Sequence, residues 1–412
     1  MGSQPNDSVG RPVEARWCAV TGSRGFMARH LVAALLRSGE WCVRVTDLAP
    51  TVMLGSGEIE GLLGDALRDG RAVYSSANVC NLDQLTKAFE GVDVVFHTAA
   101  ADPSKNDLQL HYKVNVEGTK NVIDACKICK VKRLIYTSSS AVVFNGVHGL
   151  FNVNESMPYP DKFPDAYAQT KAEAEKLVLK ANGTNELLTC SIRPASIFGP
   201  GDILVPTLDC YGRKMFIIGD GQNCDDFVYV ENVVHGHLCA EKTLSTQDGA
   251  KTSGGKAYFI TNMEPINMWD FLYMVQEELG YKRSFKIRIP LLVIVPVSYV
   301  VEWGYKVLYH FGMRQPQMIT AARIKYSTLN RTFSCNKAVE ELGYRPVVSL
   351  KDGMKIAVYW YIRLRDADYL EQKSHVLDEN SLFNCNTVRA SGRGVGYQSS
   401  GGFKCVVGLA ED

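Results

Sequence analysis

Three side chains in the middle of the chain have the types and spacing needed to move a proton to or from an alcohol or ketone oxygen. Tyr167 and Lys171 are four residues apart, so on a helix they share one face. Ser139 comes just after an apolar run that ends at Thr137. An ammonium beside a phenol stabilises the phenolate, so Tyr167 would take a hydroxyl proton while Ser139 orients the reacting oxygen. Ser138 is the alternative to Ser139, since strand alternation turns only one of them toward the substrate.

A glycine-rich turn near the beginning of the chain predicts the binding of a dinucleotide. The apolar run 17–21 is followed by Gly22, Ser23 and Gly25, and a helical pattern begins at Phe26 and Met27. A strand, a tight turn and a helix N-terminus in this order form a site for pyrophosphate. Without this turn, Tyr167 and Lys171 would be read as residues of a solvated helix face.

Asp47 ends the next apolar strand and defines the expected cofactor. A carboxylate there would accept hydrogen bonds from the ribose hydroxyls and repel a 2′-phosphate, so NAD is favoured over NADP. Arg44 has the opposite strand parity and is not expected to hold a 2′-phosphate. Further contacts with the cofactor are expected at the ends of successive strands and nearby helices. The full predicted set is Gly22, Ser23, Gly25, Phe26, Met27, Asp47, Asn78, Val79, Thr98, Ala99, Ala100, Asn115, Thr137, Tyr167, Lys171, Pro194 and Ile197.

The alternation of strands and helices predicts an α/β fold, a Rossmann-type doubly wound parallel sheet with a smaller C-terminal substrate-binding region. We expect a disordered leader at 1–15 and an NAD-binding domain with the catalytic residues at 16–195. The substrate-binding region, interleaved with the sheet, is expected at 196–362. Residues 363–412, charged and then rich in Gly and Ser, are expected to form a disordered tail.

Composition excludes several classes of function. Lys and Arg total 45 and Asp and Glu 44, so no basic excess supports nucleic-acid binding. The 12 cysteines are scattered, as in a protein with reduced thiols. The close pair Cys126 and Cys129 is interpreted as helix packing, so no metal site is predicted. His97, inside an apolar strand, is interpreted as a packed histidine.

Several segments together resemble the extended short-chain dehydrogenase/reductase family and, within it, the 3β-hydroxysteroid dehydrogenase group. The likeness is greatest to plant-type sterol-4α-carboxylate 3-dehydrogenases (decarboxylating) and covers roughly residues 15–360. Ala28 stands where the family usually has a third glycine, and Asn78 and Asn81 stand where relatives usually have acids. The segments that carry the resemblance are 137–139, 167–173, 179–183, 192–201, 227–233, 258–262, 264–266 and 342–346.

The resemblance implies that the 3β-hydroxyl of a 4α-carboxysterol is oxidised with NAD and that the C4 carboxylate leaves as carbon dioxide, a step of sterol biosynthesis. A cation should hold the carboxylate, and Arg323 and Arg331 are the candidates, with solvated arginines as the alternative. The resemblance further implies a homodimer, other sterol C4-demethylation enzymes as partners, and attachment to the cytosolic face of the endoplasmic reticulum membrane.

The most apolar stretch is expected to associate with a membrane. It occupies residues 289–312, but its uncharged part ends before Glu302 and is too short to span a bilayer. Glu302, Lys306 and His310 recur every four residues, as on one face of an amphipathic helix. A peripheral or monotopic segment is therefore predicted, and an ordinary lid or core helix is the alternative.

Three other functions remain open at this stage. The same residues suit a 3β-hydroxysteroid dehydrogenase acting on another steroid, with or without isomerase activity. They also suit an NAD-dependent nucleotide-sugar epimerase, although the apolar stretch argues against a sugar nucleotide. A non-catalytic NAD-sensing protein is the third, and retention of Tyr167 and Lys171 argues against it.

Overall fold

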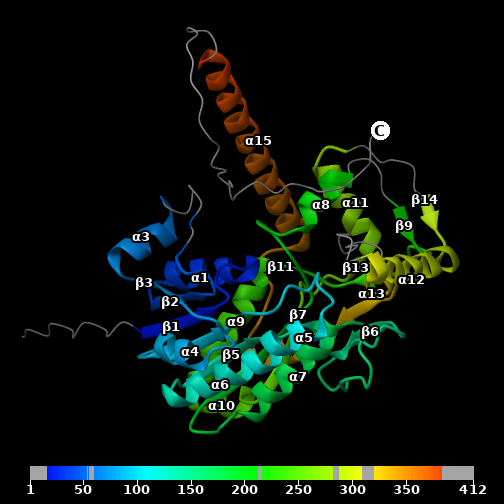
Figure 1. The fold of residues 1–412 in the computed structure, drawn as a ribbon. Coiled ribbons are helices and arrows are strands. Elements are labelled where there is room, and N and C mark those ends of the chain that lie inside the picture. Colours follow the sequence, from blue (N-terminus) through cyan, green and yellow to red (C-terminus); the bar gives the residue numbers. More distant parts are fainter. Residues whose placement is uncertain are drawn as a thin grey trace, which may run out of the picture.

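A parallel sheet of seven strands runs through the centre of the part of the chain that the structure describes (Figure 1). The structure is a computed structural model, and it describes residues 16–52, 54, 60–211, 216–281, 287–308 and 320–382. The strand order is β3-β2-β1-β4-β5-β7-β12 and every pairing is parallel. The strands are β1 (Arg16–Thr21), β2 (Trp41–Asp47), β3 (Ala72–Ser76), β4 (Val94–His97), β5 (Arg133–Thr137), β7 (Leu188–Pro194) and β12 (Lys256–Ile260).

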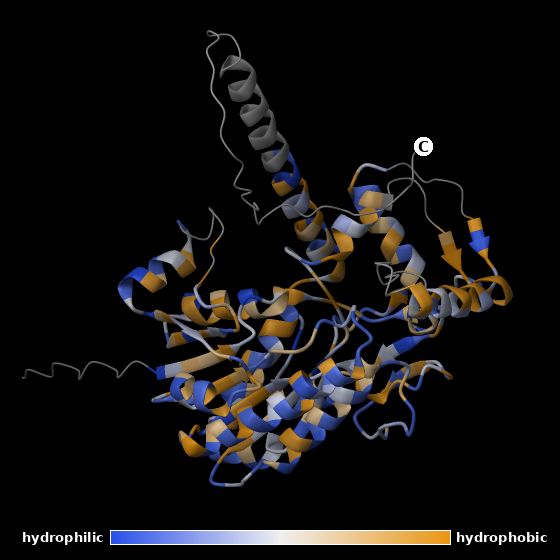
Figure 2. Cartoon of the chain, viewed as in Figure 1, coloured by the Kyte–Doolittle hydropathy of each residue, from blue (hydrophilic) through white to orange (hydrophobic). Residues whose placement is uncertain are grey.

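Apolar residues cover both faces of this sheet, as expected for parallel strands connected by helices. In β1, Cys18 and Val20 belong to one buried cluster while Ala19 belongs to the other. Figure 2 shows hydrophobic residues along the strands, with hydrophilic residues on the outer sides of the surrounding helices. The helices and helical turns of this part are α1 (Phe26–Ser38), α3 (Leu62–Asp69), α4 (Leu82–Phe89), α5 (Leu108–His111), η1 (Tyr112–Glu117), α6 (Gly118–Ile128), η2 (Ser140–Val143), α7 (Ala166–Lys180), α9 (Val230–Leu244) and α10 (Gln247–Ser253).

The order of the strands reverses on the two sides of β1, which lies between β2 and β4. Ligands of doubly wound sheets bind at the carboxyl ends of the strands next to such a reversal. The predicted doubly wound Rossmann-type sheet is therefore confirmed, and its reversal lies directly beside Gly22.

Smaller sheets and helices form the C-terminal region, which also returns to the main sheet through β12, as predicted. One small sheet has the order β13-β10-β15-β6, and two strand pairs are β11-β8 and β14-β9. The elements are β6 (Leu150–Val153), β8 (Ser196–Phe198), α8 (Leu204–Tyr211), β9 (Phe216–Ile218), β10 (Cys224–Asp225), β11 (Phe227–Tyr229), β13 (Ile266–Asn267), α11 (Met268–Glu278), β14 (Ile287–Ile289), α12 (Leu291–Leu308), α13 (Ala321–Thr328), β15 (Arg331–Phe333), α14 (Asn336–Leu342) and α15 (Leu350–Leu382).

The structure tests the predicted start of the C-terminal tail but not the predicted N-terminal leader. Helix α15 continues to Leu382, so the prediction that an unstructured tail begins at residue 363 is wrong for 363–382. The leader 1–15, the end of the tail at 383–412, and His310 with Phe311 lie outside the described residues.

A buried ion pair fixes α7 against β7. Glu175 on α7 and Arg193 on β7 are joined by a 2.7 Å contact, with side chains 0% and 4% exposed. Glu175 also accepts hydrogen bonds from Tyr159 and Ser191, each 2.7 Å long. Burial by itself would raise the pKa of Glu175, but the charge and hydrogen bonds of Arg193 lower it overall. The pair is thus ionised and its carboxylate is well satisfied.

Removing one partner of this pair should destabilise the protein strongly. We expect Arg193→Met to lower the free energy of unfolding by about 3–5 kcal/mol, because it leaves a buried carboxylate without its cation. Urea denaturation at neutral pH measures the change.

The matched control breaks an exposed pair on the same sheet. Lys132→Met removes the contact with Asp93, in which the lysine is 69% exposed, and should cost less than about 1 kcal/mol. Similar decreases in the free energy of unfolding of the two variants would show that the buried pair stabilises the protein no more than the exposed one.

Candidate active site

The glycine-rich turn is packed directly against the loop that follows β4. Gly22 has a φ of 66°, and a methyl group placed on it would lie 2.7 Å from the Cα of Ala99. The hydroxyl of Thr21 accepts hydrogen bonds from the backbone N–H groups of Thr98 and Ala99, at 3.2 and 3.3 Å. Glycine is therefore required at position 22 both for its backbone conformation and for this close approach.

The turn presents a buried polar atom with no partner. The hydroxyl oxygen of Ser23 is buried and makes no hydrogen bond within the described residues. Buried polar groups are nearly always hydrogen-bonded, so this hydroxyl is a suitable donor for a bound pyrophosphate. Together with the required glycine it fits the dinucleotide predicted from the sequence.

Asp47 lies at the end of β2 and faces the same turn. Its two carboxylate oxygens accept hydrogen bonds from the N–H groups of Arg24 at 2.8 Å and Leu48 at 2.7 Å. A carboxylate has about four acceptor positions, so it can still accept from a ribose. Arg44 instead donates to carbonyls at the end of α4, including that of Ala88 at 3.2 Å, so the prediction that it faces away is confirmed.

Several other predicted cofactor residues have structural partners in the protein. Met27 is buried in the core, so only its backbone belongs to the turn. Asn78 accepts from the N–H of Cys80 at 2.9 Å, and Val79 packs closely against Gly118. Phe26 is half-buried and makes an edge contact with the ring of His30, with centroids 5.6 Å apart.

Asn115 connects the loop after β4 with the catalytic helix. It lies in the π-helical turn η1, and its amide oxygen accepts from the N–H of Ala101 at 2.8 Å. Its amide nitrogen donates to the hydroxyl of Thr170 at 3.0 Å. Because both ends of the side chain are bound to protein, Asn115 acts here by positioning these two segments.

One pocket gathers many of the residues predicted to be catalytic or to hold the cofactor. It lies at the carboxyl ends of the strands and includes Ala195, which the sequence analysis did not single out. Its lining consists of Thr98, Ala100, Thr137, Ser138, Ser139, Tyr167, Lys171, Pro194, Ala195 and Ile197.

Tyr167 and Ser139 form the reactive pair of this pocket. Asp165 caps α7 by accepting from the N–H of Ala168 at 2.8 Å, which places Tyr167 in the first turn. Burial raises the pKa of Tyr167, and a hydrogen bond with Ser139 lowers it. The expected lowering of this pKa by Lys171 is not produced by the protein alone, because burial dominates. Because the side chain hydrogen-bonded to Tyr167 is that of Ser139, Ser139 is the serine that faces the phenol.

Lys171 lies buried behind the pocket. Its ammonium donates to the carbonyl oxygen of Thr137 at 2.5 Å and lies 4.3 Å from the centroid of the Tyr136 ring. Burial lowers the pKa of Lys171 to about 7, although the charge of Glu175 acts in the opposite direction. The side chain can therefore exchange between the ammonium and the neutral amine near neutral pH.

His97 and His237, near this site, serve structural roles. His97 is fully buried, with ring nitrogens 2.8 Å from the Thr21 hydroxyl and 2.9 Å from the Thr119 hydroxyl. Burial lowers its pKa to about 3, so the ring is neutral. The prediction of a packed, hydrogen-bonded histidine is confirmed. His237 on α9 binds the Thr137 hydroxyl at 2.7 Å and so supports the end of β5.

The two arginines predicted to hold a substrate carboxylate are not equivalent. Arg331 forms a short ion pair with the buried Asp225 and lies over the ring of Tyr326. Its charge is therefore already neutralised by the protein. Arg323 is exposed on α13.

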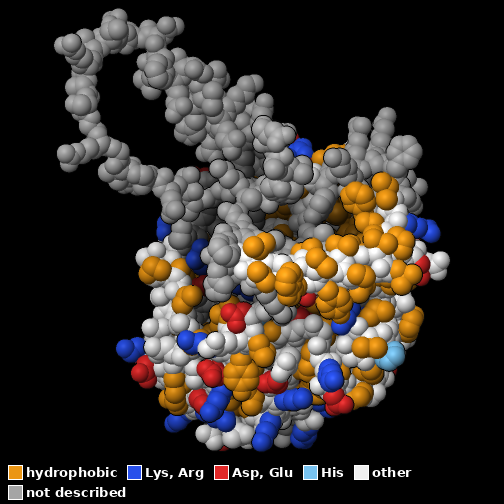
Figure 3. Space-filling model, turned by 45° about the vertical axis from the view of Figure 1, so that its right-hand side comes forward, with side chains coloured by type: hydrophobic (Ala, Val, Ile, Leu, Met, Phe, Trp, Pro, Cys, Tyr) orange, Lys and Arg blue, Asp and Glu red, His pale blue; other side chains and the backbone are white. Residues whose placement is uncertain are grey.

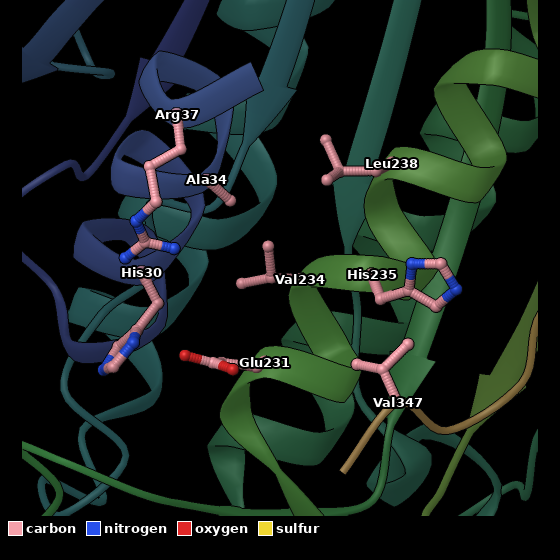
Figure 4. Close-up of a pocket in the computed structure, with 8 residues that line it drawn as sticks. All are labelled: His30, Ala34, Arg37, Glu231, Val234, His235, Leu238 and Val347. Atoms are coloured by element: carbon pink, nitrogen blue, oxygen red, sulfur yellow. The ribbon is translucent and has the colours of Figure 1, made fainter.

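A second hollow lies between α1 and α9 (Figure 4). Its polar groups are His30 and Arg37 from α1 and Glu231 and His235 from α9. A ring nitrogen of His30 lies 2.8 Å from the carbonyl oxygen of Pro200. This hollow shares no residue with the pocket of Tyr167, so the reactive groups described above do not reach it.

Comparison with known proteins identifies the family. Residues 19–291 match the 3-beta hydroxysteroid dehydrogenase/isomerase family. The chain belongs to this family of oxidoreductases, within the extended short-chain dehydrogenases/reductases.

Among individual relatives, the chain is similar to isoform 1 of the 3beta-hydroxysteroid-dehydrogenase/decarboxylase of Arabidopsis thaliana. They are 52% identical over 85% of this chain and 80% of that protein. Isoform 2 from the same plant is 54% identical over 82% of this chain, but only 61% of isoform 2 is covered. The human sterol-4-alpha-carboxylate 3-dehydrogenase, decarboxylating, is 38% identical over 85% of this chain and 90% of the human protein.

A solved structure supports the fold independently. A dTDP-glucose 4,6-dehydratase of Streptomyces venezuelae, crystallised with NAD, superposes with a TM-score of 0.63. The two sequences are 21% identical, and the superposition covers 85% of this chain and 98% of the dehydratase chain. At this identity the likeness concerns the fold alone.

The buried Lys171 predicts how stability depends on pH. The unfolded chain holds a proton on this lysine up to about pH 10.4, while the folded chain releases it near pH 7. Stability should therefore rise with pH across this window. Lys171→Met should flatten the rise and stabilise the protein at pH 7 by about 2–4 kcal/mol.

Urea denaturation of the two proteins from pH 6 to pH 10 measures this effect. Lys180→Met, at the exposed end of the same helix, is the control and should keep the wild-type slope. If Lys171→Met keeps that slope as well, burial does not lower the pKa of this lysine in the folded protein.

Proposed function

We propose that the protein oxidises the 3β-hydroxyl of a 4α-carboxysterol with NAD and releases the C4 carboxylate as carbon dioxide, a step of sterol C4 demethylation. The observation that carries this proposal is the pair of Tyr167 and Ser139 beside the buried Lys171. The pair lies in a chain that is 52% identical to a 3beta-hydroxysteroid-dehydrogenase/decarboxylase. The name of the human relative supports the carboxylated sterol as the substrate.

Each residue of the pocket has one role in the oxidation. Ser139 donates a hydrogen bond to the C3 oxygen and orients it toward Tyr167. Tyr167 accepts the hydroxyl proton, and Lys171 in its protonated form stabilises the phenolate. The nicotinamide cofactor, when bound, supplies the hydride acceptor. Gly22, Ser23 and Asp47 would hold its pyrophosphate and ribose.

The loss of carbon dioxide follows from the ketone that the oxidation creates. The bond between C4 and the carboxylate carbon breaks, and its electron pair forms the enolate of the 3-ketone. Ser139 and the protonated Tyr167 hydrogen-bond the enolate oxygen, and C4 then takes up a proton. No additional oxidant is consumed, because the carbon–carbon cleavage is redox-neutral once the ketone is present.

The preference for NAD rests on Asp47. Its carboxylate lies beside the turn, where a 2′-phosphate would meet a like charge. Arg44, the neighbouring cation on β2, is engaged by the end of α4 and does not offset this repulsion.

Anaerobic turnover of the purified protein tests the reaction. With NAD and a 4α-carboxysterol we expect NADH and carbon dioxide in equal amounts, because each oxidised molecule loses its carboxylate. NADP should give a rate at least about 10-fold lower, since a 2′-phosphate costs at least about 1.4 kcal/mol beside a carboxylate. NADH without carbon dioxide would mean that oxidation is not coupled to decarboxylation.

Tyr167→Phe is the matched variant for this measurement. It removes one oxygen and should lower turnover by about 10²–10⁴-fold while NAD binding, followed by nucleotide fluorescence, is retained. Unchanged turnover in this variant would falsify the proposed proton transfer.

We also propose that α12 lies on a membrane surface. In the cell, this membrane would be that of the endoplasmic reticulum. Within the described residues, none of the helices is both long and apolar enough to cross a bilayer. The outward side of α12 nevertheless carries a continuous apolar arc. This arc consists of Leu292, Val293, Tyr299, Val300, Trp303 and Val307, all exposed.

The surroundings of this arc favour lipid as its occupant. Ile287 and Phe216 on the β14-β9 pair are also exposed and extend the apolar surface. Figure 3 shows hydrophobic side chains gathered on the face of the molecule that carries α12. Glu302 turns toward the protein, where it accepts from the N–H of Ala321 at 2.8 Å. A sterol substrate is itself dissolved in lipid, so attachment through α12 would place the enzyme at the membrane that contains its substrate.

Vesicle flotation tests the attachment. Replacing Leu292, Val300 and Trp303 by Glu should reduce the fraction bound to phosphatidylcholine vesicles at least about 10-fold, because it removes most of the apolar area that would enter the interface. The control replaces three exposed apolar residues elsewhere, Val73, Ile128 and Phe151, by Glu. Equal losses in both variants would assign binding to general hydrophobicity rather than to α12.

A further inference from the structure

Helix α13 borders the catalytic residues on the side away from the glycine-rich turn. The ring of Tyr326 on α13 lies 5.1 Å from the ring of Phe144, which follows the helical turn begun by Ser139. Burial raises the pKa of Tyr326, and the neighbouring Asp165 and Tyr167 raise it further. Tyr326 therefore lies next to the first turn of α7, the turn that carries Tyr167.

The side chain preceding Tyr326 crosses the two segments that lead to the catalytic pair. A methyl group placed on Gly146 would lie 3.0 Å from the Cδ of Lys325 and 3.6 Å from its Nζ. The same methyl group would lie 3.0 Å from the Cβ of Pro164. Gly146 follows the turn of Ser139, and Pro164 directly precedes the cap of α7. The side chain of Lys325 thus passes Gly146 at the place where the segment after Ser139 meets the segment before Tyr167.

Lys325 differs from the two arginines nearby because the residue is half-buried and its charge is not neutralised. Within the described residues, no carboxylate forms an ion pair with Lys325 and no acceptor takes a hydrogen bond from its Nζ. Arg331 is neutralised by Asp225, and Asp165 is used as the cap of α7. A half-buried cation without a counterion favours an anionic ligand, because an ion pair offsets its loss of hydration.

We propose that Lys325 binds the carboxylate of the substrate and thereby selects sterols that carry an acid next to the reacting hydroxyl. This deepens the proposed function and rests on it. The C3 oxygen bound by Ser139 and Tyr167 and the C4 carboxylate are on adjacent carbons. The cation that recognises the acid must therefore lie near that pair. Lys325, whose stem packs over Gly146 in the segment after Ser139, is better placed for this than the exposed Arg323.

The role of Lys325 is binding rather than acceleration of the carbon–carbon cleavage. The carboxylate keeps its charge while the 3β-hydroxyl is oxidised, so an ammonium beside it stabilises the bound substrate and the transition state of oxidation equally. Its removal should raise KM for the acid and leave kcat nearly the same.

Steady-state kinetics of the full chain with NAD tests the assignment on two sterols. One carries the 4α-carboxylate, and the other carries a 4α-methyl group in its place and is measured as substrate or as competitive inhibitor. Lys325→Met should reduce the preference for the acid about 10–100-fold, through KM and not kcat, because a charge-assisted hydrogen bond is lost. Lys325→Arg should restore part of this preference.

Arg323→Met, on the same helix, is the matched control and should keep the wild-type preference. If Lys325→Met weakens both sterols equally, the residue supports the fold of the site and the proposal is overturned. An unchanged preference in Lys325→Met overturns it as well. Failure of the wild-type protein to form NADH from the acid would instead refute the proposed function, so the two failures are distinguishable.

Discussion

The placement of the catalytic helix depends on one buried ion pair. Tyr167, Lys171 and Glu175 lie on successive turns of α7 and share the face toward the sheet. Glu175 is bound to Arg193 and Ser191 of β7, the strand whose end at Pro194 lines the pocket. A rotation of α7 would leave a buried carboxylate unpaired, at a cost of several kcal/mol. The pair therefore holds the phenol and the ammonium at the end of β5, where Ser139 meets them.

The features of the site that could be predicted from the sequence are those encoded by residues close together in the chain. The strand, turn and helix around Gly22 and Gly25, the parity of Arg44 and Asp47, and the spacing of Tyr167 and Lys171 are all visible within single elements. Backbone periodicity and the conformational freedom of glycine determine these features, so they follow from sequence. The doubly wound sheet then followed from the alternation of such elements.

The parts that were not predictable depend on contacts between distant segments. Arg331 was a reasonable cation by residue type, but Asp225, far away along the chain, neutralises it. Lys325 has no motif, and only the fold brings its stem over Gly146. Burial, which spacing does not show, raises the pKa of Tyr167. The charged run after residue 363 suggested disorder, yet its Arg, Glu and Leu residues are good helix formers and α15 continues through it.

Helices α12 and α13 together have the polarity that an amphiphilic acid requires. The substrate we propose has hydrocarbon at one end and a carboxylate beside the reacting carbon at the other. Glu302 of α12 accepts a hydrogen bond from the N–H of Ala321, the first residue of α13, so the helix with the outward apolar arc is hydrogen-bonded to the helix that carries Lys325. An apolar surface outside and a cation inside would orient the sterol with its acid toward Tyr167. The same contact turns the carboxylate of Glu302 away from the apolar arc, since it is satisfied by the N-terminus of α13.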